Sequence, residues 1–241
     1  MSAATPPASS SGTAEDDRSP LPEGASRWVN RIGRWIGTTI GLVFFRIRVR
    51  DRDRLPHGGP VVLVANHSSL IDGPLLFGLV RRPCVFLIKH EIFRGPLGRA
   101  LRRMGQLPVR RGEVDRVPLL ASIRVLRAGG LVAVFPEGTR GSGDVSGAHN
   151  GAAWLARSSD ALVVPVACRG TRRPEGSGRR FRPRVDVLFG EAFTVPSGRG
   201  RAALHEATAR VQGELAELVR ELDRRLIAET GSPGMDEGEQ T

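Results

Sequence analysis

The chain has 241 residues, a hydrophobic content of 40% and a formal net charge of +11. This length and composition suit one globular α/β core, and two isolated cysteines exclude a disulfide scaffold and a cysteine-rich zinc site. The positive charge predicts attraction to polyanions such as anionic lipid headgroups, and nucleic acid is the rival polyanion. Against nucleic acid, the arginines are scattered, no zinc-finger or RNP-like pattern occurs, and there are no tyrosines to stack on bases.

The first 50 residues divide into two parts. Residues 1–26 are rich in Ser, Ala, Pro, Gly and acidic residues and lack an apolar centre, which predicts a disordered tail rather than a secretory signal. In residues 27–50, Trp28, Trp35 and other apolar residues recur near helical spacing among arginines, which predicts an amphipathic segment at a membrane interface. Its apolar stretch at 35–45 is too short to span a bilayer, which needs about 20 residues. The alternative is an N-terminal helix and strand packed on the core.

An apolar run at 61–65, bounded by glycine and proline before it and Asn66 after it, predicts a strand buried on both faces. Chemistry in α/β sheets usually sits past the carboxyl end of such a strand, where His67 and Asp72 follow. A turn would let these side chains hydrogen-bond, so that Asp72 holds one ring nitrogen and the other can take a proton from a hydroxyl. Asp72 is also expected to cap the helix that follows. The alternative is that both are ordinary turn and cap residues.

Two further segments bring basic side chains to predicted strand ends. Lys89 is the only lysine in the chain and ends an apolar run. A short extended piece at 104–112 delivers Arg110 and Arg111. Because lysines and arginine pairs at such positions are usually just solvated, a substrate contact and a solvent-facing position both remain open for them.

A second buried-strand pattern, residues 131–135, opens directly into a polar loop. In this loop Gly138 lets the backbone approach a ligand, Thr139 offers a hydroxyl, and Arg140 can grip a phosphate with a planar fork of donors. The loop therefore predicts an anion cradle, with an ordinary β-turn as the alternative. A phosphate repels Glu137, so this carboxylate is expected to orient Arg140 or another basic group.

The rest of the chain continues the alternation of strands and helices. Apolar strands are predicted at 163–167 and 185–189. Between them, residues 170–184 form a basic, glycine-rich loop that either guides an acidic donor or is solvated. Apolar residues between 204 and 226 mark one face of a long helix that packs across the sheet, with a partner-binding coiled coil as the alternative. Residues 231–241 are expected to fray.

Taken in order, four of these blocks resemble the PlsC-like glycerolipid acyltransferases. The blocks are residues 67–72, 105–111, 135–140 and 163–167. The first fits the family's motif of a histidine followed after four residues by an aspartate. The second fits a glycine followed six residues later by a phosphate-contacting arginine, the third is the acceptor-phosphate block, and the fourth is a strand linked to acyl-chain or donor contacts. The resemblance covers about residues 55–193.

The resemblance implies a role for each matching residue. His67 would act as the catalytic base and Asp72 as its orienting carboxylate. The residues implied in binding the acceptor's phosphate are Arg111, Glu137, Gly138, Thr139 and Arg140, with Lys89 and Arg110 as further candidates. We expect no metal and no cofactor, because the remaining histidines lack metal-ligand spacing and the acyl group arrives on acyl-CoA or acyl carrier protein as a co-substrate.

The resemblance also implies a fold and a reaction. We expect a single α/β domain at 51–230, like that of glycerol-3-phosphate acyltransferase, with a mixed central sheet flanked by helices. It would acylate the sn-2 hydroxyl of 1-acyl-sn-glycerol 3-phosphate to give phosphatidate. The site would be the cytoplasmic face of the cell membrane, with the protein peripheral or monotopic on anionic lipids. The alternatives are another lysophospholipid, glycerol 3-phosphate or a glycolipid as acceptor, and an inactive membrane-binding module.

Overall fold

The computed structural model describes residues 20–110, 115–136, 150–172, 181–198 and 200–230. Its strands are β1 (Arg46–Arg50), β2 (Val61–Ala65), β3 (Cys84–Lys89), β4 (Leu107–Val109), β5 (Leu131–Val134), β6 (Leu162–Arg169) and β7 (Arg184–Phe189). Its α-helices are α2 (Arg27–Phe44), α3 (Asp72–Leu79), α4 (Gly95–Arg103), α5 (Arg116–Arg127), α6 (Gly151–Ser159) and α7 (Gly200–Thr230). Short 3-10 helices occupy Arg52–Arg54 and His90–Ile92.

The described strands form one sheet in the order β1-β7-β6-β2-β5-β3-β4. Strands β6, β2, β5, β3 and β4 run parallel to one another, whereas β7 runs antiparallel to β6 and β1 runs parallel to β7. The predicted single α/β domain with a mixed, helix-flanked sheet is therefore confirmed. The strand directions also place the starts of β1 and β7 at the edge where the five parallel strands end.

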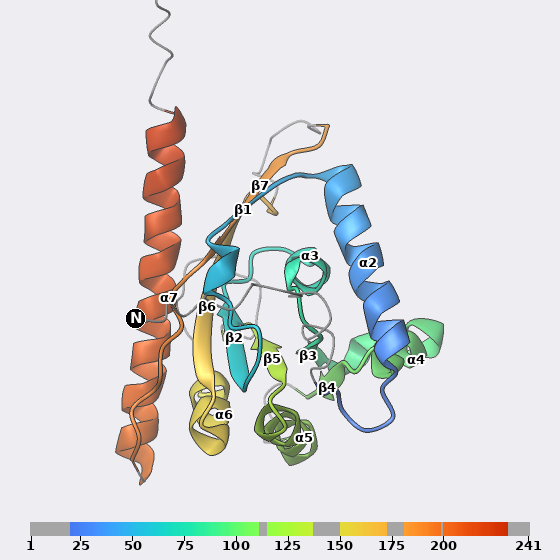
Figure 1. Cartoon of the computed structure of the whole chain (residues 1–241), viewed down its shortest axis with the longest axis vertical. Coiled ribbons are helices and arrows are strands. Elements are labelled where there is room, and N and C mark those ends of the chain that lie inside the picture. Colours follow the sequence, from blue (N-terminus) through green and yellow to red (C-terminus); the bar gives the residue numbers. More distant parts are fainter. Residues whose placement is uncertain (1–19, 111–114, 137–149, 173–180, 199, 231–241) are drawn as a thin grey trace, which may run out of the picture.

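Helices cover both faces of the sheet (Figure 1). Strand β2 is buried along its whole length, and its side chains alternate between two cores, as expected for a central strand. Leu63 packs in the core under α3, whereas Val62 and Val64 pack in the core formed with α5, α6 and the first half of α7. The second half of α7 packs on β6 and β7 through apolar residues such as Leu215 and Leu222. The predicted packing of this long helix across the sheet is confirmed.

A buried arginine aligns the two strands that lead to the candidate site. Arg82 is 1% exposed, and its guanidinium donates to the carbonyls of Pro56 (3.1 Å), Gly59 (2.9 Å) and Gly129 (2.5 Å). These carbonyls belong to the loops that precede β2 and β5. Because the donors of a guanidinium are fixed in one plane, Arg82 fixes the two loops relative to each other and satisfies carbonyls that the sheet leaves unpaired.

Helix α2 packs on α3 through glycines. A Cβ atom added at Gly78 of α3 would lie 2.5 Å from the backbone nitrogen of Thr38, and one added at Gly37 would lie 2.7 Å from the carbonyl oxygen of Pro74. The two helix backbones therefore touch at a place where any larger residue would push them apart. The amino end of α2 is held by the Asn30 side chain, which donates to a carbonyl just after α4 at 2.7 Å.

The large apolar residues of α2 point away from the core. Trp28 and Trp35 are 69% and 68% exposed. The other exposed apolar residues on this helix are Ile36, Ile40, Leu42, Val43 and Phe44. The helix thus places its glycines inside and its large apolar side chains in solvent, the reverse of an ordinary surface helix. Among the described residues, no helix combines the length and hydrophobicity needed to cross a membrane.

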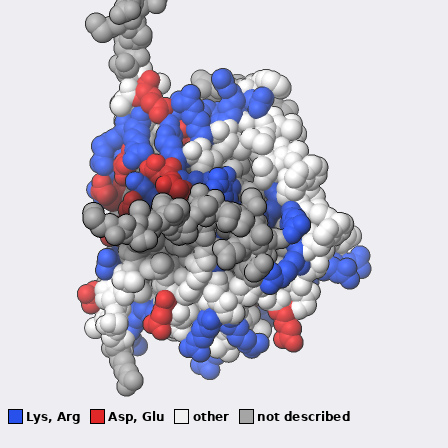
Figure 2. All heavy atoms as spheres, in the orientation of Figure 1, with Lys and Arg blue, Asp and Glu red and all other residues white. Residues whose placement is uncertain are grey.

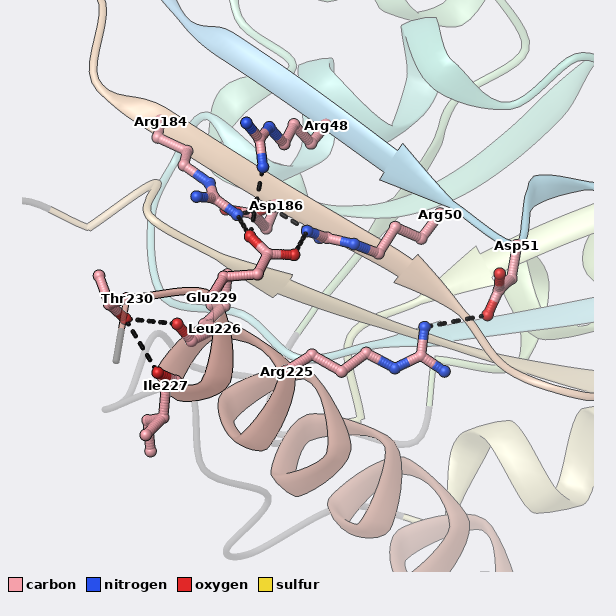
Figure 3. A network of polar contacts seen from close by, with 10 residues as sticks. All are labelled: Arg48, Arg50, Asp51, Arg184, Asp186, Arg225, Leu226, Ile227, Glu229 and Thr230. Atoms are coloured by element: carbon pink, nitrogen blue, oxygen red, sulfur yellow. Dashed lines mark hydrogen bonds and ion pairs between the residues drawn. The ribbon is translucent and has the colours of Figure 1, made fainter. Parts of the chain in front are cut away.

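The carboxyl end of α7 is fastened to the edge strands by ion pairs (Figure 3). Asp186 of β7 is buried and accepts from Arg50 of β1 at 2.7 Å and from Arg184 of β7 at 2.6 Å. Glu229 of α7 accepts from the same two arginines and from Arg48. Because two carboxylates share three guanidinium groups, the network joins β1, β7 and α7 into one rigid edge.

Candidate active site

The candidate residues gather at the edge of the sheet where the parallel strands end. His67 follows β2, and Phe135 follows the neighbouring strand β5. Lys89 ends β3, and Arg110 follows β4, the last strand on that side. Because adjacent parallel strands end side by side, these residues form a row along one edge, which is where α/β sheets place their ligands.

His67 and Asp72 form a buried pair in the turn between β2 and α3. Nδ1 of His67 lies 3.1 Å from Oδ2 of Asp72. The histidine is 8% exposed and the aspartate is fully buried. This is the contact that the spacing of the two residues predicted, and the turn between them brings it about.

The Asp72 carboxylate also organises the turn that carries the histidine. Its Oδ2 accepts the backbone N–H groups of Ser68 (2.8 Å) and Ser69 (2.7 Å). The prediction that Asp72 caps α3 is wrong, because Asp72 is the first residue of that helix and Ile71 occupies the capping position. Its carboxylate instead binds the residues before the helix. A negative charge is still favoured in the first turn of a helix, where it complements the helix dipole.

The hydrogen bond to Asp72 determines which histidine nitrogen can react. A carboxylate can only accept, so Nδ1 of His67 carries the proton and the Nε2 lone pair is available to take another. If Nε2 takes a proton, the resulting imidazolium lies directly against a buried carboxylate, where the attraction is stronger than in water. The pair therefore has the arrangement of a general base with its orienting group.

Aromatic residues hold the histidine ring from the side. Phe135 stacks on His67, with ring centroids 4.2 Å apart and an angle of 21° between planes. Phe86 of β3 lies 5.9 Å from Phe135, and Phe77 of α3 lies 6.3 Å from Phe86. The stack restricts rotation of the imidazole. The sequence placed Phe135 only at a strand end, because its partner depends on β2 and β5 being neighbours.

A second anchor that the sequence did not reveal ties the turn to β6. The buried side chain of Asn66 accepts from the backbone nitrogen of Cys168 at 2.7 Å and donates to its carbonyl at 3.0 Å. The hydroxyl oxygens of Ser68 and Thr171 lie 3.4 Å apart. The Asn66 side chain thus continues the contact between β2 and β6 after the backbone pairing of β2 ends. The turn is held by Asn66 before His67 and by Asp72 after it. Only the position of Asn66 next to a histidine could have signalled this role.

The basic candidates differ in how the structure describes them. Lys89 is half exposed, and its Nζ lies 3.1 Å from Oε1 of Glu91. Arg110 is exposed, and its backbone N–H donates to the Asp115 carboxylate at 3.4 Å. Because β3 lies two strand spacings from β2 and β4 lies three, these residues are about 10–15 Å along the edge from the histidine. The predicted residues that lie outside the described part of the chain are Arg111, Glu137, Gly138, Thr139 and Arg140.

Neither cysteine has the surroundings of a nucleophile. Cys84 in β3 and Cys168 in β6 are completely buried. Burial raises the pKa of both thiols, and the Asp72 carboxylate raises the pKa of Cys168 further. Both therefore stay protonated at neutral pH and serve as small core residues. Within the described ranges, no group of three His, Cys, Asp or Glu residues could hold a metal ion.

Comparison with known proteins supports the same chemistry. A family profile described as Acyltransferase matches residues 46–169, which run from β1 to the end of β6 and include the buried histidine pair. The chain belongs to the PlsC-like acyltransferase family. It is accordingly an O-acyltransferase, and the predicted family is confirmed.

Relatives of known name span most of the chain. It is 27% identical over 189 residues to a 1-acyl-sn-glycerol-3-phosphate acyltransferase from Bacillus subtilis, a match covering 75% of this chain and 89% of that protein. It is 28% identical over 219 residues to a lyso-ornithine lipid O-acyltransferase from Brucella abortus, covering 84% and 79%. The crystal structure of PlsC, the 1-acyl-sn-glycerophosphate acyltransferase of Thermotoga maritima, superposes with a TM-score of 0.62 at 26% identity, covering 87% and 83%. Several eukaryotic relatives are longer, and the chain spans less than half of their length.

Proposed function

We propose that this O-acyltransferase transfers a fatty acyl group from a thioester to the free sn-2 hydroxyl of 1-acyl-sn-glycerol 3-phosphate, which gives phosphatidate. The observation that carries the proposal is the buried hydrogen bond between His67 and Asp72 at the ligand-binding edge of the sheet. Relatives named for this reaction support the choice of acceptor.

The proposed reaction uses one proton shuttle. Nε2 of His67 takes the proton of the acceptor hydroxyl as its oxygen attacks the thioester carbonyl. Asp72 stabilises the imidazolium that forms. The tetrahedral intermediate then collapses, the carbon–sulfur bond breaks, and the imidazolium returns its proton to the leaving thiolate. Because a thioester is already activated, no acyl-enzyme intermediate is needed.

The acceptor must present its hydroxyl to His67 with little freedom, because orientation supplies much of the rate in such reactions. In the proposal, Arg111 and Arg140 hold the phosphate, with Glu137 orienting a guanidinium group and the backbone at Gly138 allowing close approach. The sequence motifs support these roles. Lys89 and Arg110 add positive charge along the same edge, where they would attract the phosphate group before it is bound.

The proposed place of reaction is the surface of the cell membrane on its cytoplasmic side. The exposed tryptophans and aliphatic residues of α2 support it, because large apolar side chains gathered in solvent along one helix mark an interaction site. Figure 2 shows a largely uncharged area at the upper right of the view, on the side of α2, with basic side chains above it and along its lower border. Anionic headgroups would match both features, since a net charge of +11 attracts them.

A second acceptor class is supported by one relative. The Brucella abortus protein is named for acylating lyso-ornithine lipid, and it matches this chain over a longer stretch than the Bacillus subtilis protein does. That acceptor has no glycerol phosphate, so it would not use a phosphate cradle. The histidine pair would serve either acceptor, because the proton transfer is the same.

Acyl transfer by the purified full-length chain tests the proposal. Long-chain acyl-CoA and acyl carrier protein are each supplied with 1-acyl-sn-glycerol 3-phosphate, glycerol 3-phosphate or lyso-ornithine lipid, and free thiol is measured. We expect thiol release only with 1-acyl-sn-glycerol 3-phosphate, with phosphatidate as the lipid product. Thiol release with lyso-ornithine lipid alone would identify that lipid as the acceptor in place of 1-acyl-sn-glycerol 3-phosphate. Thiol release that is independent of any acceptor would contradict the proposed reaction.

A further inference from the structure

A large apolar side chain is almost fully exposed three residues before β7. Phe181 is 94% exposed, the highest value among the large apolar residues of the described chain. The next residue, Arg182, contacts the carboxyl end of α2, where Leu42, Val43 and Phe44 are each more than half exposed. Single exposed apolar residues are ordinary, but four of them together with adjoining apolar surface are not. We call this set, together with Arg46 and Arg182, the β7 corner.

Backbone and side-chain contacts fix the β7 corner in place. Nη2 of Arg182 donates to the carbonyl of Leu42 at 2.6 Å, and the backbone nitrogen of Arg46 donates to the carbonyl of Pro183 at 3.0 Å. Arg182 adopts a φ of +49°, in the left-handed region that non-glycine residues rarely occupy. The chain therefore turns sharply after Phe181, while the arginine is held against the last turn of α2. The ion-pair network of Figure 3 keeps β1 and β7 rigid directly behind this turn.

Within the described residues, the two arginines of the β7 corner form no ion pair with an acidic side chain. Arg46 is exposed. Arg48 and Arg184 in the adjoining strands share Glu229, so the acidic groups of this region are already engaged. Aromatic and aliphatic side chains next to arginines are the composition of surfaces that bind anionic bilayers.

The position of the β7 corner relates it to the active site. Because β1 and β7 begin at the edge where β2 ends, the corner and His67 lie at the same edge of the sheet. The loop after His67 also exposes Leu70 at that edge. A helix lying on a bilayer can roll about its own axis, so α2 alone would not determine which edge of the sheet faces the lipid. A second contact beyond its end would remove that freedom.

We propose that the β7 corner is a second membrane contact, in which Phe181 enters the headgroup region and Arg46 and Arg182 bind the phosphates of anionic lipids. This inference rests on the proposed function, and it adds the orientation in which the enzyme meets its acceptor. The apolar surface runs on from the corner along α2, which favours a bilayer over an acidic protein as the occupant, since a protein would need a partner of matching extent.

Sedimentation with vesicles tests the inference. The full chain and its Phe181→Ser and Arg46→Gln variants are mixed with phosphatidylcholine vesicles with and without phosphatidylglycerol. We expect Phe181→Ser to weaken binding to both vesicle types about tenfold or more, as burial of a phenylalanine predicts. Arg46→Gln should weaken binding about fivefold on anionic vesicles only. The matched control is Val117→Ser on α5, which removes a 77% exposed apolar side chain from the opposite face and should change nothing.

Activity on two acceptor forms separates this inference from the proposed function. Phe181→Ser should act normally on a short-chain, water-soluble lysophosphatidate and slowly on a long-chain acceptor in vesicles. If the wild-type enzyme were inactive on both acceptors, the proposed function would be contradicted. The vesicle-binding assay would still test the membrane contact of the β7 corner. Unchanged vesicle binding by Phe181→Ser would overturn the inference. An equal loss of activity by Phe181→Ser on both acceptors would also overturn it. The same holds if Arg46→Gln weakens the binding of acyl carrier protein and leaves vesicle binding unchanged.

Discussion

A single methyl group should reveal whether α2 is held by its glycines. In Gly78→Ala, the new Cβ would lie 2.5 Å from the backbone nitrogen of Thr38 and 2.8 Å from the carbonyl carbon of Gly37. Ordinary contacts are nearer 3.5–4 Å, so the backbones of α2 and α3 must separate by about 1 Å. Overpacking of this kind costs about 1–3 kcal/mol, and the better helix propensity of alanine returns up to about 1 kcal/mol.

With about 1 kcal/mol returned, the net loss for Gly78→Ala is about 0–2 kcal/mol, or a fall in Tm of up to about 8 °C for a chain of this size. The matched control is Gly213→Ala on α7, where a Cβ would meet nothing within 4 Å and the variant should gain about 0.5–1 kcal/mol. Thermal unfolding followed by circular dichroism measures both. If both alanine variants are stabilised to the same extent, the close contact between the helices is refuted.

Three further predictions follow from the site and the edge network. Asp72→Asn should lower kcat by about 10²–10⁴-fold with little change in KM, because an amide can present the wrong group to His67 and cannot neutralise an imidazolium; a kcat within about threefold of wild type would contradict the pairing. Cys84 and Cys168 should resist a thiol reagent at neutral pH until denaturant is added, because burial raises the pKa of both, and rapid labelling of the native protein would argue against this. Hydrogen bonding to Arg184 lowers the pKa of Glu229, so its stabilising contribution is present above the ordinary glutamate value of 4.5 and is lost as the pH falls through the lowered value. Glu229→Gln should therefore lower Tm at neutral pH but not in strong acid. An equal fall in Tm at both pH values would contradict the claim that the charge of Glu229 stabilises the fold.

The sequence was sufficient for the strands that carry the site. Buried runs such as 61–65 and 131–135 become β2 and β5, because continuous apolar residues suit a strand covered on both faces. The spacing of His67 and Asp72 allowed a pair across a turn, and the resemblance to the family motif favoured that pair over two ordinary turn and cap residues. The C-terminal helix followed from its apolar period.

Contacts between segments far apart in the chain could not be predicted in this way. The stacking of Phe135 on His67 and the bonds from Asn66 to Cys168 depend on which strands are neighbours, and strand order is not written in any local pattern. The orientation of α2 was ambiguous for another reason. Its tryptophans are compatible with either a core or a membrane. The face that packs inward is formed by glycines, which have no side chain to mark it as apolar in the sequence.

The rate of acyl transfer by His67→Ala tests directly whether this imidazole acts as the general base. With 1-acyl-sn-glycerol 3-phosphate and a long-chain acyl thioester, the variant should lose about 10²–10⁴-fold in kcat while keeping its fold and its KM for the acceptor. His205→Ala, which removes an exposed histidine on α7, is the matched control and should be unchanged. A His67→Ala enzyme that transfers acyl groups at close to the wild-type rate would contradict the claim that this imidazole removes the hydroxyl proton.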